Sequence, residues 1–223
     1  MYSIAIDGPA GAGKSTIAKI LSRGLGYIYI DTGAMYRAVA LYFIKNGVTA
    51  DKEEDLSKLL SGLDIDIKYK DGSQILYLNG EDVSERLREE EIGKLASKFS
   101  TLKIVREKLT ALQRSLAKKE NVVMDGRDIG TVVLPDANLK IFLSADSKVR
   151  AKRRYLELLE KGVDNINIDD IEREIVNRDN ADMTREISPL KRADDAHFLD
   201  TSNMSLDEVV EKITEMIKRE DES

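Results

Sequence analysis

Eight residues near the N-terminus have the types and spacing needed to hold a chain of phosphates. The run Gly8-Pro9-Ala10-Gly11-Ala12-Gly13-Lys14-Ser15 follows the apolar residues 4–6 and leads into a helical pattern. Glycines let several backbone N–H groups point at one spot, where the Lys14 ammonium can meet phosphate charge and the Ser15 hydroxyl can hold Mg²⁺. An ordinary glycine turn needs neither Lys14 nor Ser15 in register. The pattern therefore predicts a P-loop that binds a nucleoside triphosphate.

A second group of polar residues, Asp31-Thr32-Gly33-Ala34-Met35-Tyr36-Arg37, directly follows the apolar run 27–30. If that run is a strand of an open α/β sheet, these residues lie at the carboxyl edge, where ligands bind. An arginine one turn into the next helix can point back at a bound anion. Asp31 and Thr32 also suit a helix N-cap, a role compatible with binding, and Arg37 taken alone is equally typical of a plain surface residue.

A third group lies in Val122-Val-Met-Asp-Gly-Arg-Asp-Ile-Gly130, another apolar run that ends in polar residues. Asp125 is placed like the acid that orients Mg²⁺ or its water shell in P-loop enzymes, although a carboxylate here can also cap a turn. Arg127 suits a phosphate, whereas Asp128 would repel one but can accept hydrogen bonds from the exocyclic amine of a base. The adjacent pair indicates a nucleotide as the second ligand.

The elements that must position these groups follow from the apolar pattern. Short apolar runs at 4–6, 27–30, 122–124, 139–143 and 198–199 are separated by helical patterns. Because the runs are mostly continuous, they predict strands covered on both faces, as in a parallel, doubly wound α/β sheet. The last helix is predicted to start at Ser205, with Glu208 three residues on as a capping box.

Two stretches lie outside this core pattern. Residues 63–70 alternate between apolar and polar, Asp71-Gly72 is a turn signal, and 74–79 is again apolar. This pattern predicts an antiparallel hairpin with one solvent-exposed face. Residues 148–192 mix many arginines and lysines with acids on helical patterns, and most of these charges fit solvated helices with i,i+4 pairing.

Composition excludes several function classes. The 223 residues carry a formal charge of −6, which argues against a broad electrostatic hold on nucleic acid. With no cysteine and His197 as the single histidine, cysteine-ligated metals and multi-histidine zinc sites are excluded. No signal-peptide pattern or membrane-length apolar stretch is present in the sequence, so we expect a cytoplasmic protein without a membrane partner.

Taken together, the three motifs closely resemble the bacterial cytidylate (CMP/dCMP) kinases of the nucleoside monophosphate kinase group. The resemblance extends over essentially the whole chain and includes Asn177-Arg-Asp-Asn-Ala-Asp182. It implies an α/β fold with a three-layer P-loop kinase core, a parallel five-stranded sheet, a small antiparallel β insert and a helical lid. It further implies a single domain over 1–223, with the monophosphate-binding insert at about 57–95 and the lid at about 150–192.

The resemblance also implies roles for individual residues. It assigns catalysis to Lys14, Arg185, Arg153 and Asp125, and Mg²⁺ binding to Ser15 and Asp125. It assigns ATP binding to Gly8, Pro9, Ala10, Gly11, Ala12, Gly13, Lys14, Ser15, Thr16, Arg150 and Arg154. Thr32, Ser97, Arg127 and Asp128 would contact the cytosine end of the acceptor, Arg37 and Arg106 its phosphate, and Arg178 and Asp182 its pentose. Thr32 stands where some members carry serine, which keeps the hydroxyl.

The expected reaction is in-line transfer of the γ-phosphoryl group of MgATP to CMP or dCMP, giving ADP and CDP or dCDP. We expect a monomer that acts on small molecules and not on nucleic acid. Three alternatives stay open at this point: a P-loop kinase for another small acceptor such as UMP or shikimate, a GTP-dependent switch, and a nucleic-acid-stimulated ATPase. The Asp-Gly-Arg-Asp run and the β insert weigh against the first, the lack of an Asn-Lys-x-Asp motif against the second, and the acidic charge against the third.

Overall fold

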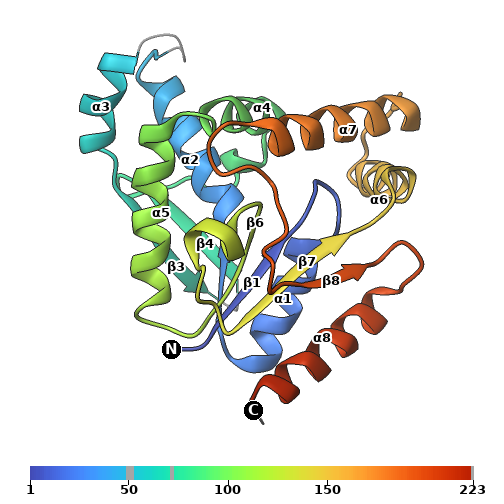
Figure 1. Cartoon of the computed structure of the whole chain (residues 1–223). Helices are drawn as coiled ribbons and strands as arrows, with labels where there is room; N and C mark the ends of the chain where they lie inside the picture. The colour runs from blue at the N-terminus through green and yellow to red at the C-terminus, as the bar shows by residue number, and fades with distance from the viewer. Residues whose placement is uncertain (49–52, 71–72, 222–223) are drawn as a thin grey trace. The chain divides into compact units, whose positions relative to one another are not determined.

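A computed structural model describes residues 1–48, 53–70 and 73–221, which form two compact units. Unit 1 comprises residues 1–28 and 120–223, and unit 2 comprises residues 29–119. The elements, coloured along the chain in Figure 1, are β1 (Ser3–Asp7), α1 (Lys14–Leu25), β2 (Ile28–Asp31), α2 (Thr32–Lys45), α3 (Glu53–Ser61), β3 (Ile65–Lys70), β4 (Ser73–Leu78), β5 (Glu81–Asp82), the 3₁₀ turn η1 (Arg86–Arg88), α4 (Glu90–Phe99), α5 (Lys103–Ala117), β6 (Val122–Gly126), the π-helical turn η2 (Ile129–Val133), β7 (Leu139–Ser144), α6 (Ser147–Glu160), α7 (Ile168–Thr184), β8 (His197–Asp200) and α8 (Leu206–Asp221).

The five predicted apolar runs are the five strands of one sheet, in the order β2-β6-β1-β7-β8. The pairs that β1 makes with β6 and β7 are parallel, as is the pair of β7 with β8. Ile6 lies opposite Asp125 and Asp7 opposite Gly126, so β1 and β6 end side by side. The register therefore brings two of the predicted motifs to the same edge of the sheet.

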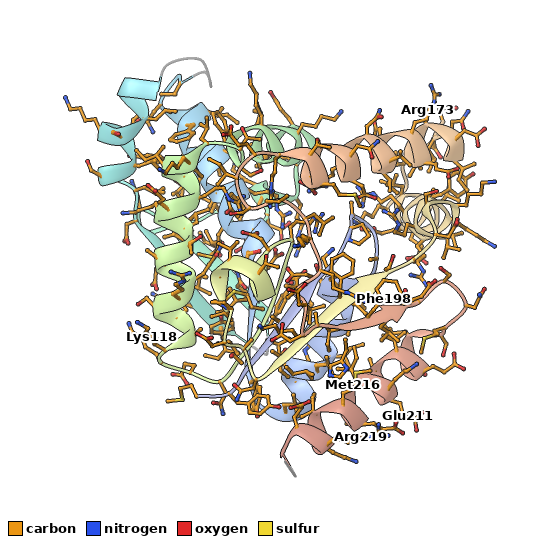
Figure 2. The ribbon with its side chains drawn as sticks, viewed as in Figure 1. Lys118, Arg173, Phe198, Glu211, Met216 and Arg219 are labelled. Atoms are coloured by element: carbon orange, nitrogen blue, oxygen red, sulfur yellow. The ribbon has the colours of Figure 1, made fainter. Side chains whose placement is uncertain are left out.

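Helices α1 and α8 of unit 1 pack against each other, and α1 also packs against β6 (Figure 1). The predicted capping box is present: the Ser205 N–H donates to a Glu208 carboxylate oxygen at 2.7 Å. Val209, Ile213 and Ile217 bury the inner side of α8. Glu211 and Arg219 project from its outer side (Figure 2). The amphipathic pattern thus fixes which side of α8 meets the core.

The prediction that every strand is covered on both faces is wrong for β8. This strand lies at the end of the sheet, and Phe198 is 51% exposed. The Phe198 ring (Figure 2) stacks on Phe142 of β7 at 6.3 Å between centroids, and the Arg192 guanidinium lies 5.8 Å from the Phe198 centroid. On this face of β8, Phe142 and Arg192 contact Phe198 in place of a covering helix.

Helices α6 and α7 form a helical pair in the stretch that is rich in basic residues. They pack through Ala151, Ile171 and Ile175, with Tyr155 and Leu158 at the margin of the cluster. Charged side chains lie on the outer surface of the pair: Arg173 projects from α7 (Figure 2) and pairs with Asp170. Within the described part of the chain, no helix is long and apolar enough to cross a membrane.

Unit 2 contains the predicted antiparallel hairpin, extended by a short third strand in the order β3-β4-β5. Ile65 pairs with Leu78 and Ile67 with Leu76, which gives one apolar face and confirms the predicted alternation. The predicted turn residues, Asp71 and Gly72, lie outside the described residues. Helix α2 packs against α4, α5 and β4, and the Phe43 ring meets Phe99 edge-on at 4.8 Å.

Candidate active site

The loop between β1 and α1 is shaped by glycines at both of its ends. Gly8 has a φ of +146°, and a Cβ at this position would lie 2.0 Å from the carbonyl oxygen of Leu143. Only glycine lets the backbone pass so close to β7. Gly13, with a φ of 84°, precedes the first residue of α1, which is Lys14. The helix therefore begins at the lysine that the phosphate-binding motif requires.

Lys14 is buried, and its Nζ donates to the carbonyl oxygen of Pro9 at 2.7 Å. Burial is the main cause that holds the pKa of Lys14 well below its usual value, and the positive charge of Arg127 is the next. The negative charges of Asp125 and Asp7 act in the opposite direction. A bound phosphate would supply the negative charge that favours the ammonium form. The surroundings of Lys14 are thus suited to an anionic ligand.

Ser15 and Asp125 are brought together from α1 and β6. The Ser15 hydroxyl donates to Asp125 Oδ2 at 2.8 Å. Hydroxyl and carboxylate oxygens are hard ligands of the kind that Mg²⁺ takes from proteins, with waters and substrate phosphates completing the octahedron. The donor set therefore fits a magnesium ion that arrives with phosphates.

Asp7, a residue that the sequence analysis did not select, lies at the carboxyl end of β1. Its two carboxylate oxygens accept from the backbone N–H groups of Ile129 and Gly130 at 2.8 and 2.7 Å. Burial raises the pKa of Asp7 to about 6, opposed by these two hydrogen bonds and by Lys14 and reinforced by the charge of Asp128. Asp7 thereby ties the end of β1 to the loop that follows Asp128.

Four of the predicted acceptor-site and catalytic residues form one network of alternating charge in unit 1. The Arg127 Nε–H donates to Asp182 at 2.8 Å, and the Arg185 guanidinium lies 3.6 Å from both Asp182 and Asp128. These side chains are between 6% and 18% exposed. A buried network with both signs of charge can bind a ligand that carries donors and acceptors, as a nucleotide does.

The remaining arginines predicted to bind the substrates lie on α6 and α7. Arg150 is buried and donates to Ala10 and Ala145 carbonyl oxygens. Arg153 donates to the carbonyl oxygen of Thr201 at 2.7 Å, and Arg154 pairs with Glu157. Arg178 is exposed on α7, and its charge contributes to the lowered pKa of Lys14. The roles of these four arginines toward the substrates stay predictions.

Unit 2 holds Arg37 near the N-terminus of α2. Asp31 caps this helix by accepting the Ala34 N–H at 2.8 Å, and its other oxygen lies 3.1 Å from Arg37 NH2. The Asp31 N–H in turn donates to Gln74 of β4 at 2.9 Å. Asp31 therefore performs the predicted capping role and at the same time orients the Arg37 guanidinium.

The other predicted acceptor residues in unit 2 lie on α2, α4 and α5. Arg106 is buried, donates to the carbonyl oxygen of Ser100 at 3.0 Å and lies 5.5 Å from the centroid of the Tyr36 ring. Thr32 is buried as the first residue of α2, and Ser97 is half-buried on α4. Ring and carbonyl together hold the Arg106 guanidinium away from water.

The sequence analysis missed two buried carboxylates, Asp7 and Asp179. Asp7 comes directly before the P-loop glycine at the end of an apolar run, and a polar residue at that position is a readable signal. Asp179 lies inside the motif 177–182, but its partners are Ala10 and Arg150, remote in sequence. The spacing of motif residues alone could not identify these two partners of Asp179.

Comparison with known proteins gives consistent matches. A family model described as "Cytidylate kinase" matches residues 4–219. A protein named cytidylate kinase from Lactobacillus johnsonii is 54% identical over 219 residues, covering 98% of this chain and 95% of that protein. One of the same name from Caldicellulosiruptor bescii is 51% identical over 214 residues, covering 96% and 94%.

Solved structures with low sequence identity share the fold. A protein from Eubacterium ventriosum described as uncharacterized matches with a TM-score of 0.55 at 14% identity, covering 98% of this chain and 99% of that one. TT1252 from Thermus thermophilus matches with a TM-score of 0.50 at 19% identity, covering 98% and 97%. At these identities the likeness concerns the fold alone.

Proposed function

Because the chain belongs to the cytidylate kinase family, we propose that the site around its P-loop transfers the γ-phosphoryl group of ATP to CMP or dCMP. The products are ADP and CDP or dCDP. The observation that carries the proposal is the convergence in unit 1 of Lys14 and the Ser15–Asp125 pair with the charged network around Asp128. Lys14 and the Ser15–Asp125 pair suit a triphosphate, and the charged network around Asp128 suits a base.

We propose that the donor is bound by residues 8–16, with the Lys14 ammonium on its phosphates. Ser15 and Asp125 would hold Mg²⁺, which when bound neutralises phosphate charge and orients the terminal phosphates. On ATP binding, Lys14 would exchange the carbonyl of Pro9 for phosphate oxygens, whose negative charge favours its ammonium form. This arrangement places positive charge where the transition state accumulates negative charge.

The transfer requires little covalent help from the protein. An oxygen of the CMP 5′-phosphate attacks the γ-phosphorus, a new P–O bond forms, and the bond to the β-phosphate oxygen breaks with its electrons going to ADP. The attacking phosphate is already an anion, so no base has to remove a proton. Catalysis then comes from alignment and from cations around the transferring group, and one arginine can supply about 10³- to 10⁵-fold in rate. We propose Arg185 and Arg153 for this role.

For the acceptor, we propose that Asp128 accepts the exocyclic amine of cytosine, with Arg127, Thr32 and Ser97 at the same end. A carboxylate discriminates against uracil, which presents a carbonyl oxygen in place of the amine. Arg37 and Arg106 would bind the 5′-phosphate, because a guanidinium fork matches two phosphate oxygens. Arg178 and Asp182 would contact the pentose.

We propose that residues of about 57–95 act as the monophosphate-binding insert and those of about 150–192 as a lid. Arg150, Arg153 and Arg154 on α6 would lie on the donor side of this lid. Closure over ATP would exclude water and limit hydrolysis before the acceptor arrives. The cysteine-free sequence suits a reducing compartment, and we propose a cytoplasmic monomer.

Transfer of label tests this proposal. Incubation with ATP labelled at the γ-phosphate, MgCl₂ and CMP should yield labelled CDP, while omission of Mg²⁺ should suppress the product. Label released as inorganic phosphate irrespective of CMP would contradict the proposal and favour an ATPase or a nucleotide-dependent switch. Label transferred to shikimate and not to CMP would favour another small-acceptor kinase.

A further inference from the structure

The two peptide groups that flank Ala10, in the P-loop, are both held by one buried ion pair. Its N–H donates to Asp179 Oδ1 at 2.9 Å, and its carbonyl oxygen accepts from Arg150 NH1 at 2.8 Å. The same NH1 lies 2.5 Å from Asp179 Oδ2, and the two side chains are 8% and 7% exposed. Arg150 comes from α6 and Asp179 from α7, so one pair joins three segments.

Two further contacts tie this pair to its surroundings. The Arg150 Nε–H donates to the carbonyl oxygen of Ala145, the residue that follows β7, at 2.8 Å. A Cβ at Gly11 would lie 3.3 Å from Arg150 Cβ and 3.8 Å from Ile175 Cδ1. The tip of the loop therefore packs directly on α6 and α7, and a side chain at Gly11 would press on them.

The geometry points to a positioning role: we propose that Arg150 and Asp179 form a latch that sets the P-loop conformation for the donor phosphates and couples it to helices α6 and α7. A carboxylate is not a phosphate ligand, so Asp179 must act through Ala10. By bonding the N–H of the Pro9–Ala10 peptide and the carbonyl of the Ala10–Gly11 peptide, the pair fixes the orientation of both peptide planes, and with it the direction of the neighbouring loop N–H groups. The inference deepens the proposed kinase function and rests on it.

The latch predicts an effect confined to the donor. Asp179→Asn keeps an acceptor oxygen for Ala10 but removes the charge that holds Arg150. We expect the KM for ATP to rise about 10- to 100-fold, the range that corresponds to losing one charge-assisted hydrogen bond. The KM for CMP and the CMP/UMP preference should stay within about twofold of the wild type. Simple electrostatics predicts the opposite sign, because removing a negative charge near the phosphates would lower the KM for ATP.

A matched control uses a hydrogen bond between the same two helices. The Ser147 hydroxyl on α6 donates to Glu172 on α7 at 2.6 Å, and this hydrogen bond does not involve the P-loop. Ser147→Ala should therefore leave the KM for ATP unchanged. Arg150→Lys, a second variant, should raise this KM in the same direction. The Asp179→Asn, Arg150→Lys double variant should be no worse than the more damaged single variant, since both lose the same latch.

A readout that does not depend on activity separates this inference from the proposed function. Hydrogen exchange of amides 9–13 in the ligand-free protein should be faster in Asp179→Asn, and in Arg150→Lys, than in the wild type and in Ser147→Ala. If the wild type were inactive but showed this exchange pattern, the kinase proposal would be refuted and the latch would still be supported. Unchanged exchange, an unchanged or lowered KM for ATP in Asp179→Asn, or an equal rise in both Michaelis constants would overturn the latch.

Discussion

Replacing Asp7 by asparagine should remove a specific component of the pH dependence of folding. The Asp7 carboxylate is buried and accepts two backbone hydrogen bonds, from Ile129 and Gly130. Asparagine has nearly the same shape but offers one acceptor oxygen and carries no charge at any pH. One hydrogen bond is lost in the variant, at a cost of about 1 kcal/mol that does not vary with pH.

The pH-dependent part follows from the raised pKa of Asp7. Burial raises it from 3.8 to about 6, so the folded chain binds this proton more tightly than the unfolded chain. The resulting stability is fully present below pH 3.8 and is lost as the pH rises through about 6. The difference between the two pKa values corresponds to about 3 kcal/mol. The free energy of unfolding of the wild type should therefore fall by most of this amount, about 2 to 2.5 kcal/mol, relative to Asp7→Asn between pH 4 and 7.5.

Urea unfolding of both proteins at half-unit pH steps measures this difference directly. Asp66→Asn is a suitable control, because Asp66 lies on β3 with its side chain 56% exposed and its carboxylate 3.8 Å from Lys68 Nζ. Its curve should stay parallel to that of the wild type. If the curves of Asp7→Asn and wild type were also parallel from pH 4 to 7.5, the burial argument for Asp7 would be refuted.

Three further predictions concern the reaction. Lys14→Met should lower kcat by about 10²- to 10³-fold, the usual cost of one transition-state donor, and steady-state kinetics at saturating ATP checks it; an unchanged kcat would exclude Lys14 from catalysis. Arg37→Lys should raise the KM for CMP by about 10- to 100-fold while leaving that for ATP unchanged, since an ammonium cannot reproduce the fork that Asp31 orients; if neither Michaelis constant moved, Arg37 would not bind the acceptor phosphate. Asp128→Ala should reduce the ratio of kcat/KM for CMP over UMP by about 10- to 100-fold, and a ratio equal to the wild type would remove Asp128 from the base site.

The sheet was predictable from sequence because each strand is a local signal. Continuous apolar runs mark β1, β2, β6 and β7, and the capping box at Ser205 and Glu208 marks the start of α8. The exposure of Phe198 was not predictable in the same way, because it depends on β8 being the last strand of the sheet. Strand order is set by packing between distant segments, which composition does not record.

The site was predictable where motif spacing encodes chemistry, as in the P-loop and the Ser15–Asp125 pair. It was not predictable where a residue acts across a long sequence separation. Asp7 holds a loop more than one hundred residues away, and Asp179 holds the peptide of Ala10. The position of Asp7 before the P-loop glycine marks a strand end, and that of Asp179 suggests a helix surface, but neither names a partner. Their role depends on burial and on the partners that the fold brings to them.

The central claim is that this chain phosphorylates cytidine monophosphates. Its most direct test is ADP formation from MgATP with CMP, dCMP, UMP, AMP, GMP and shikimate, each compared with a reaction that lacks an acceptor. We expect strong turnover with CMP and dCMP, weak turnover with the others, and little hydrolysis without an acceptor. Equal ADP formation with and without CMP, or turnover with shikimate alone, would contradict it.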